Sequence, residues 1–197
     1  MQRRSWLASR EITDPYFLYL GNLQPRKNLP RLVAAFARAR RATPQLAGYR
    51  LVIAGEHWAW GGAREGLAGL APAGSVAFLG RVTDDERDTL FRDTTAFVYP
   101  SIFEGFGLPP LEALAAGAPV VASRTSAMPE VLGDAAVLVD PLEIDMIANA
   151  LVRVATDGAL RADLRVRGPE RAARFSAQAM GERALVAFRL AISSSRS

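Results

Sequence analysis

Short apolar segments alternate along this chain with segments whose apolar residues recur at helical spacing, and this alternation limits the fold more than any other feature. Six segments are rich in apolar and β-branched residues and are expected to form strands: 16–20, 50–55, 76–80, 96–100, 118–123 and 135–140. Strands that are apolar throughout and separated by amphipathic helices are typical of a mostly parallel sheet covered on both faces. We therefore predict an α/β fold, a doubly wound, mostly parallel six-stranded sheet with extra C-terminal helices after residue 140.

The length of 197 residues, half of them hydrophobic, is enough for one substantial core. We expect one domain over residues 15–192. Residues 1–14 are polar and without pattern, which predicts a linker remnant, and residues 193–197 read as a flexible tail.

Several kinds of chemistry are excluded by composition. The chain has no cysteine and one histidine, His57, so thiolate chemistry and a two-histidine metal site are ruled out, and we expect no metal and no cofactor. The net charge of +4 comes from arginines spread over nearly every predicted helix. A diffuse basic surface of this kind does not indicate nucleic-acid binding.

No apolar segment approaches the length of about eighteen residues that a membrane span needs. Residues 1–14 also lack the apolar centre of a signal peptide. We expect a cytoplasmic domain, and the arginine-rich helices leave open a peripheral contact with the inner face of the membrane.

In doubly wound sheets, ligands bind beyond the carboxyl ends of the strands. The richest of these edge segments is PSIFEGFGLPPLEALAAG, residues 100–117. Gly105 and Gly107 would let the backbone approach a ligand, and the start of the helix that follows would offer unpaired N–H groups to a phosphate. The segment predicts an anion cradle built from backbone.

Two glutamates stand in this segment, Glu104 and Glu112. A carboxylate would repel a phosphate but can accept hydrogen bonds from a vicinal diol, and a nucleotide sugar has one diol on each side of its diphosphate. One glutamate for each sugar is therefore a consistent arrangement. The alternative is that Glu112 is a first-turn residue favoured by the helix dipole and Glu104 a solvated loop charge.

A second segment, GNLQPRKNL at residues 21–29, follows the first predicted strand. Arg26 and Lys27 precede a helix that Asn28 could cap, and Lys27 is the only lysine in a chain otherwise rich in arginine. Both side chains suit phosphate oxygens, arginine as a fork and lysine as a compact charge.

These segments, with LVIAGE, VAFLGRVTDDE and MPEVLGDAAVLVDP, resemble the C-terminal, donor-binding domain of retaining GT-B glycosyltransferases. That large family includes bacterial mannosyl- and glucosyltransferases and the sucrose and glycogen synthases. The similarity runs from about Pro15 to about Leu190, and two glutamates separated by seven residues are the family's signature. It implies a Rossmann-like sheet that holds a nucleotide-diphosphate sugar.

Carried over by position, the resemblance implies that Lys27, with Arg26, neutralises the departing diphosphate, that Glu104 lies near the donor sugar and that Glu112 binds the ribose. Lys27, Glu104 and Arg26 are the residues it assigns to catalysis. The residues it assigns to donor binding are Gly21, Asn22, Lys27, Arg81, Val82, Asp84, Glu104, Gly105, Phe106, Gly107, Leu108 and Glu112.

The sequence departs from the family at Asn22, where many members carry a second phosphate-binding arginine. We expect Arg26 to substitute for it. The resemblance implies transfer of a hexose, mannose from GDP-mannose or glucose from UDP-glucose, to a saccharide or lipid-linked acceptor, and a missing N-terminal acceptor-binding domain. The alternative is a stand-alone nucleotide-sugar-binding module that works with a partner chain.

Three other patterns receive simpler interpretations. His57, Trp58 and Trp60 are expected to pack or to lie at a rim. The acidic residues 84–86 are expected to be first-turn partners of a helix dipole and not metal ligands. The GFGLPP segment lacks the spacing of a dinucleotide-binding fingerprint.

Overall fold

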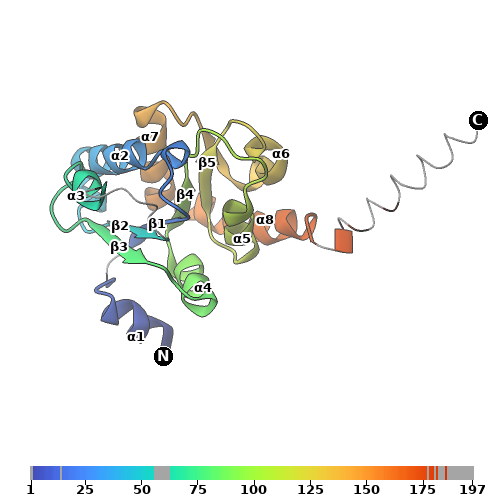
Figure 1. The fold of residues 1–197 in the computed structure, drawn as a ribbon, viewed down its shortest axis with the longest axis horizontal. Coiled ribbons are helices and arrows are strands. Elements are labelled where there is room, and N and C mark those ends of the chain that lie inside the picture. Colours follow the sequence, from blue (N-terminus) through green and yellow to red (C-terminus); the bar gives the residue numbers. More distant parts are fainter. Residues whose placement is uncertain are drawn as a thin grey trace, which may run out of the picture.

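The computed structural model describes residues 2–13, 15–55 and 63–176, together with the single positions 178, 179, 181 and 185. Its centre is a six-stranded sheet in which every neighbouring pair is parallel, in the order β3-β2-β1-β4-β5-β6 (Figure 1). The strands are β1 Tyr16–Leu20, β2 Arg50–Ala54, β3 Val76–Gly80, β4 Ala96–Tyr99, β5 Val120–Ser123 and β6 Val137–Val139. The predicted doubly wound α/β fold is confirmed.

Helices cover both faces of this sheet. They are α1 Gln2–Ser9, α2 Leu29–Ala42, α3 Ala63–Ala68, α4 Asp84–Asp93, α5 Leu108–Ala115, α6 Met128–Leu132, α7 Ile144–Thr156 and α8 Gly158–Ala173, with single 3₁₀ turns at Pro25–Lys27, Pro44–Leu46 and Gly133–Ala135. Helix α2 packs against α7, and α5 packs against α8, on opposite sides of the sheet (Figure 1). Of the C-terminal helices predicted after residue 140, the structure describes α7 and α8, and most positions after residue 176 lie outside the described residues.

The core lies between these layers, and its centre is the pair of strands β1 and β4. Phe17, Phe97 and Tyr99 are fully buried, and their rings pack with neighbouring aromatic side chains at centroid distances of 5.2–6.2 Å. Truncating one such phenylalanine to alanine in a packed core costs about 3–5 kcal/mol. The two strands that carry the site are therefore firmly anchored in the core.

The structure differs from the linker predicted for residues 1–14. Residues Gln2–Ser9 form α1, and both Leu7 and Ile12 are more than nine-tenths buried. The Trp6 indole N–H donates to Glu86 of α4 over 2.8 Å. Two buried apolar residues in a short polar segment are too few to show a periodicity, so the pattern did not reveal this packing.

Helix α4 begins with a capping box. Thr83 accepts a hydrogen bond from the Glu86 backbone N–H, and the Glu86 carboxylate accepts one from the Thr83 N–H, each satisfying a donor that the helix end leaves unpaired. That hydrogen bond from the Thr83 N–H holds the pKa of Glu86 below its usual value. The prediction that residues 84–86 lie in the first turn of a helix is confirmed.

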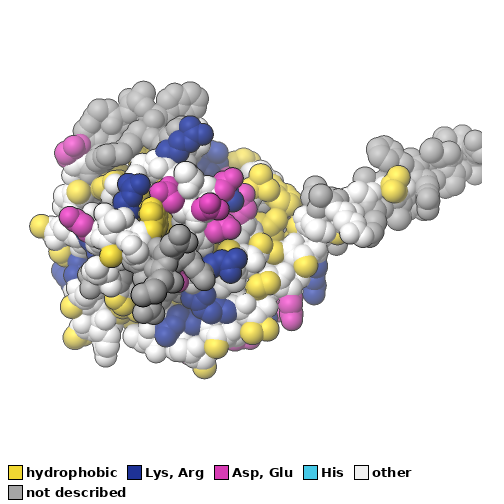
Figure 2. Space-filling model, turned by 90° about the horizontal axis from the view of Figure 1, so that it is seen from below, with side chains coloured by type: hydrophobic (Ala, Val, Ile, Leu, Met, Phe, Trp, Pro, Cys, Tyr) yellow, Lys and Arg dark blue, Asp and Glu magenta, His cyan; other side chains and the backbone are white. Residues whose placement is uncertain are grey.

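On the face shown in Figure 2, basic and acidic side chains are interspersed with hydrophobic ones and do not form a field of one sign. Among the helices that the structure describes, none combines the length and hydrophobicity that crossing a bilayer would require.

Strand order reverses at β1. The chain runs from β1 to β2 and β3 on one side, then returns to β4, β5 and β6 on the other. In sheets of this kind the crevice beyond the carboxyl ends of the two central strands is the ordinary ligand site. Here the loops that follow β1 and β4 border that crevice.

Candidate functional site

Two charged side chains from distant parts of the sequence meet in this crevice. Lys27 ends the 3₁₀ turn after β1, and Glu104 lies in the loop after β4. The two loops are joined by the Ile102 N–H, which donates to the Arg26 carbonyl over 2.8 Å. Lys27 is only 5% exposed and Glu104 only 7%, so neither is a solvated surface charge. The alternative interpretation of Glu104 as a solvated loop residue is wrong.

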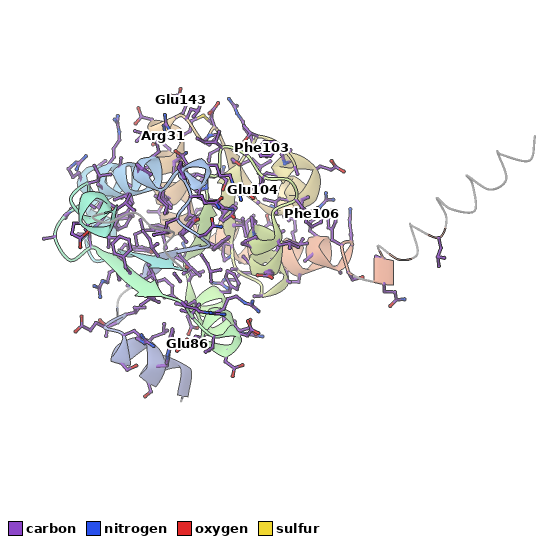
Figure 3. The ribbon with its side chains drawn as sticks, in the orientation of Figure 1. Arg31, Glu86, Phe103, Glu104, Phe106 and Glu143 are labelled. Atoms are coloured by element: carbon purple, nitrogen blue, oxygen red, sulfur yellow. The ribbon has the colours of Figure 1, made fainter. Side chains whose placement is uncertain are left out.

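A cluster of three charges results, and we call Arg26, Lys27 and Glu104 the charge cluster. Lys27 Nζ lies 2.6 Å from Glu104 Oε1, and Arg26 Nη1 lies 2.9 Å from the same oxygen. One carboxylate thus holds two cations, leaving the cluster with a net charge of +1. Figure 3 shows Glu104 at this edge, between Phe103 and Phe106. Burial within a low dielectric strengthens the attraction of such a site for a phosphate.

The ionisation of the cluster reflects two opposing effects. Burial raises the pKa of Glu104, but the hydrogen bond and charge of Lys27, together with the neighbouring Arg26, outweigh burial and hold that pKa below its usual value. Burial lowers the pKa of Lys27, and the hydrogen bond to Glu104 opposes this without cancelling it. Glu104 therefore remains an anion at neutral pH, paired with both neighbouring cations.

Two buried tyrosines contact the cluster and the loop that carries it, and neither was predicted from the sequence. The hydroxyl of Tyr99, the last residue of β4, accepts a hydrogen bond from Lys27 Nζ. The Tyr19 hydroxyl donates to the Asn22 carbonyl over 2.8 Å, and the two rings stack with centroids 5.7 Å apart. Their only sequence signal is a tyrosine near the carboxyl end of an apolar strand, which by itself also fits a core residue.

Asn28 does not cap α2 as predicted. Its backbone is left-handed, with a φ of 63°, and its side chain makes no cap hydrogen bond. Its amide instead donates to the carbonyls of Pro100 and Pro141, at 3.1 and 2.6 Å. Asn28 thus ties the loop after β1 to the loops after β4 and β6, which holds the charge cluster in register with the sheet.

Glycine is required at two edge positions. A Cβ on Gly107, whose φ is 91°, would lie 2.1 Å from Met128 Cε, and a Cβ on Gly55, at φ 130°, would lie 2.0 Å from the Gly21 carbonyl oxygen. A Cβ on Gly105 would meet nothing within 4 Å, so its neighbourhood is open. Helix α5 begins directly after Gly107, with proline in its first turn, and the binding of an anion by its first N–H groups stays a prediction.

A cavity of about 330 Å³ lies beside the charge cluster, and we call it the edge cavity. It contains five of the residues assigned by resemblance to the donor. Its lining is Leu20, Gly21, Asn22, Gly55, Arg81, Val82, Asp84 and Arg87. The structure thus brings Gly21 and Asn22 together with the segment at 81–84, which is sixty residues away in sequence.

Glu112 lies apart from both groups, on α5, with its side chain 45% exposed. Its carboxylate is 3.9 Å from Arg87 of α4, and Arg87 also pairs with Asp84 at 3.1 Å. Arg87 therefore links Glu112 to the wall of the edge cavity. Its Nε–H is buried and has no hydrogen-bond partner among the described residues. Sequence reasoning did not single out Arg87, because an arginine inside a charged helix carries no distinguishing pattern.

The remaining predicted donor residues surround the cradle. Phe106 is half-buried and packs edge-to-face on Phe175, with centroids 5.8 Å apart, whereas Leu108 is 61% exposed. Ser126 fixes this loop by accepting a hydrogen bond from the Glu104 N–H at 3.0 Å. His57, Trp58 and Trp60 lie outside the described residues.

Among the residues that the structure describes, no three acidic or histidine side chains gather closely enough to hold a metal ion. The charge cluster places two cations and one carboxylate in the crevice, and Arg81, Asp84 and Arg87 line the edge cavity. The arrangement can attract an anionic group, neutralise its charge and orient it, and these are the main contributions that proteins make to phosphate-leaving-group chemistry.

Comparison with known proteins relates the sequence of this chain to one family. The sequence model of the glycosyl transferases group 1 family matches residues 3–171. The O-antigen chain mannosyltransferase B of Escherichia coli is 36% identical over 170 residues, which cover 82% of this chain and 42% of that protein. The O-antigen chain mannosyltransferase RfbU of Salmonella typhimurium is 32% identical over 138 residues, covering 70% of this chain and 38% of that one.

Solved structures show the same fold. A sucrose-phosphate synthase from Thermosynechococcus elongatus superposes with a TM-score of 0.80 at 27% identity, over 98% of this chain and 49% of that chain. An α,α-trehalose 6-phosphate synthase from Burkholderia multivorans gives a TM-score of 0.81 at 17% identity, over 98% and 45% of the two chains. The chain thus spans less than half the length of these relatives.

Proposed function

Because this chain belongs to the glycosyl transferases group 1 family, we propose that it is the donor-binding domain of a retaining, two-domain hexosyltransferase. The chain is a glycosyltransferase domain with mannosyltransferase relatives. The donor, the retention of configuration and the domain's role within a longer enzyme are the parts that we propose.

The observation that carries the proposal is the meeting of Lys27, Arg26 and Glu104 at the point where strand order reverses. In the proposed complex the diphosphate of the donor lies over the loop after β1 and the start of α5. Lys27 and Arg26 neutralise the charge that develops on the diphosphate as the glycosidic bond breaks. The sugar lies toward Glu104 and Gly105.

The edge cavity is proposed to receive the nucleoside. A cavity of about 330 Å³, lined by Asn22, Arg81, Val82 and Asp84, is at the small end of the range for ligand pockets, which suits one base and part of its ribose. Glu112 would accept hydrogen bonds from the ribose hydroxyls, with Arg87 holding its carboxylate near the cavity wall.

No metal ion is needed in this proposal, because the protein's own cations stand where the diphosphate charge would lie. Two of the curated relatives are named as O-antigen chain mannosyltransferases. That supports GDP-mannose as the donor, with UDP-glucose as the second candidate. The acceptor would be a saccharide or a lipid-linked saccharide bound mainly by the other domain.

Calorimetric titration with GDP, UDP, ADP, GDP-mannose and UDP-glucose tests the proposal. We expect one nucleotide to bind preferentially, its nucleotide sugar to bind at the same site, and little or no multiple turnover by this chain alone. Robust turnover by the isolated chain would instead show that no acceptor-binding domain is required. Failure of every nucleotide to bind would contradict the donor-site assignment.

A further inference from the structure

Beneath the charge cluster, Tyr99 and Tyr19 hold the two ends of the loop that follows β1. Both side chains are fully buried, and their rings stack at an interplanar angle of 11°. Tyr99 contacts Lys27 at the end of the loop, and Tyr19 contacts the Asn22 carbonyl at its start. The loop therefore rests on a rigid aromatic pair that belongs to the two central strands.

The ammonium group of Lys27 is held from two sides. Its Nζ donates to Glu104 Oε1 over 2.6 Å and to the Tyr99 hydroxyl, and it lies 4.8 Å from the centre of the Tyr99 ring. A lysine ammonium has three N–H donors. The two acceptors account for two of them and so fix the direction of the third. A mobile lysine side chain loses most of its rotamer freedom when it binds a phosphate. Lys27 is already ordered before binding, so this entropy cost is smaller for it.

We propose that Tyr99 is a positioning residue that directs the third N–H of Lys27 toward the diphosphate, with the stacked Tyr19 ring keeping Tyr99 in place. The inference rests on the proposed function only for the identity of the anion. The hydroxyl of Tyr99 acts through Lys27 and does not touch the donor itself.

The charges around Lys27 act on its ammonium group from two directions, and the Tyr99 hydroxyl is the neutral group that also contacts it. Glu104 attracts the ammonium from the loop after β4, and Arg26 repels it from the same turn. Burial, followed by the charge of Glu104, raises the pKa of Tyr99, so its hydroxyl remains neutral and keeps a lone pair for Lys27. Tyr19, on β1, is kept neutral in the same way, by burial first.

The uniqueness of Lys27 makes the test direct. The full chain is labelled with ¹³Cε-lysine, which gives a single lysine resonance, and the resonance is followed by NMR as the pH is raised. Tyr99→Phe keeps the stacked ring and removes only the oxygen that stabilises the charged ammonium. The midpoint of the Lys27 titration is expected to move to lower pH in this variant.

Tyr16→Phe is the matched control. Tyr16 lies at the other end of β1, is buried to a similar degree, and donates to the Leu90 carbonyl over 2.9 Å without contacting the cluster. This variant should lose stability to a similar extent but leave the Lys27 titration unchanged. A Tyr99→Phe chain that loses stability while its Lys27 titrates as in the unmodified chain would overturn the proposal, because the role of Tyr99 would then be structural only.

A second variant approaches the contact from the lysine and does not depend on the folding of Tyr99→Phe. The chain has four tyrosines, so ¹³Cζ-tyrosine labelling gives four resonances. In Lys27→Met the Tyr99 resonance is expected to shift more than the other three. An unshifted Tyr99 resonance would contradict the contact.

Adding GDP or UDP to the lysine-labelled chain separates this inference from the proposed function. Both hold if the nucleotide moves the Lys27 resonance and Tyr99→Phe weakens nucleotide binding by roughly three- to tenfold, the loss of one indirect hydrogen bond. If no nucleotide moves the resonance but the titration shifts as expected, the proposed function fails and Tyr99 still positions Lys27. If nucleotide binds equally well to Tyr99→Phe, the positioning role fails alone.

Discussion

The two halves of the crevice are built differently. At the charge cluster, buried side chains are paired with one another before any ligand arrives, and Lys27 and Glu104 are less than a tenth exposed. At the edge cavity the lining residues are half-buried or exposed, and the Asp84 side chain is 91% exposed. The first arrangement suits a group whose charge must be stabilised in a fixed place, and the second suits recognition that adapts to its ligand.

The largest expected effect belongs to the charge cluster. Lys27→Met should weaken binding of a nucleoside diphosphate by roughly 10- to 100-fold, the worth of a charge-assisted hydrogen bond. Arg38→Met is the control, because it removes the same charge from an exposed pair with Asp145. Both affinities are measured by titration calorimetry. Equal losses of affinity in the two variants would contradict a specific role of Lys27 in binding the diphosphate.

The cluster should also make stability depend on acid. The pKa of Glu104 is held below its usual value in the folded chain, so the group contributes stability above its ordinary pKa. That contribution is lost as the pH falls through the lower, folded pKa. The free energy of unfolding is measured with denaturant from about pH 6 downward. Below the ordinary carboxyl range it should fall more steeply with pH in the unmodified chain than in Glu104→Gln. Parallel curves would mean that the buried pairing does not stabilise the fold.

A smaller effect is expected at the cavity end. Glu112→Ala should weaken binding of a nucleoside and of its diphosphate by the same factor, roughly three- to tenfold, because only ribose contacts are lost. Asp88→Ala, which removes another carboxylate near Arg87, should leave both affinities unchanged. An effect of Glu112→Ala confined to the diphosphate would move Glu112 out of the ribose site.

The smallest expected effect is a gain. Asn22→Arg places a third cation where the loop begins, beside the edge cavity, and should strengthen diphosphate binding by a few-fold. No change in affinity by calorimetry would indicate that Arg26 already fills that role. A loss would mean that the Asn22 side chain itself contacts the nucleoside.

Much of the fold could be predicted from the sequence, because buried parallel strands leave continuous apolar segments. All six strands were expected within a few residues of their bounds. The largest excess is before β5 and β6, where the apolar residues 118–119 and 135–136 precede the strands. Helix α1 was missed because its stability comes from contacts with distant residues, such as Trp6 with Glu86.

Some residues of the site could be predicted from the sequence, and others could not. Lys27 could be singled out as the only lysine of the chain, and Glu104 because it stands with Gly105 and Gly107 in the loop after a predicted strand. The burial of their pairing, and the tyrosines beneath it, could not be predicted, since Tyr19 and Tyr99 look like ordinary core residues in sequence. Asn28 was misread because the same side chain can cap a helix or join two loops, and only the approach of Pro100 and Pro141 decides which.

The most direct test of the central claim, that the charge cluster binds the donor's diphosphate, compares two ligands on two proteins. The preferred nucleoside diphosphate and its uncharged nucleoside are titrated calorimetrically against the unmodified chain and against Lys27→Met. The account predicts that the diphosphate's advantage over the nucleoside largely disappears in the variant, while the affinity for the nucleoside is unchanged. If the diphosphate keeps its full advantage without Lys27, the phosphates bind elsewhere and the central claim is wrong.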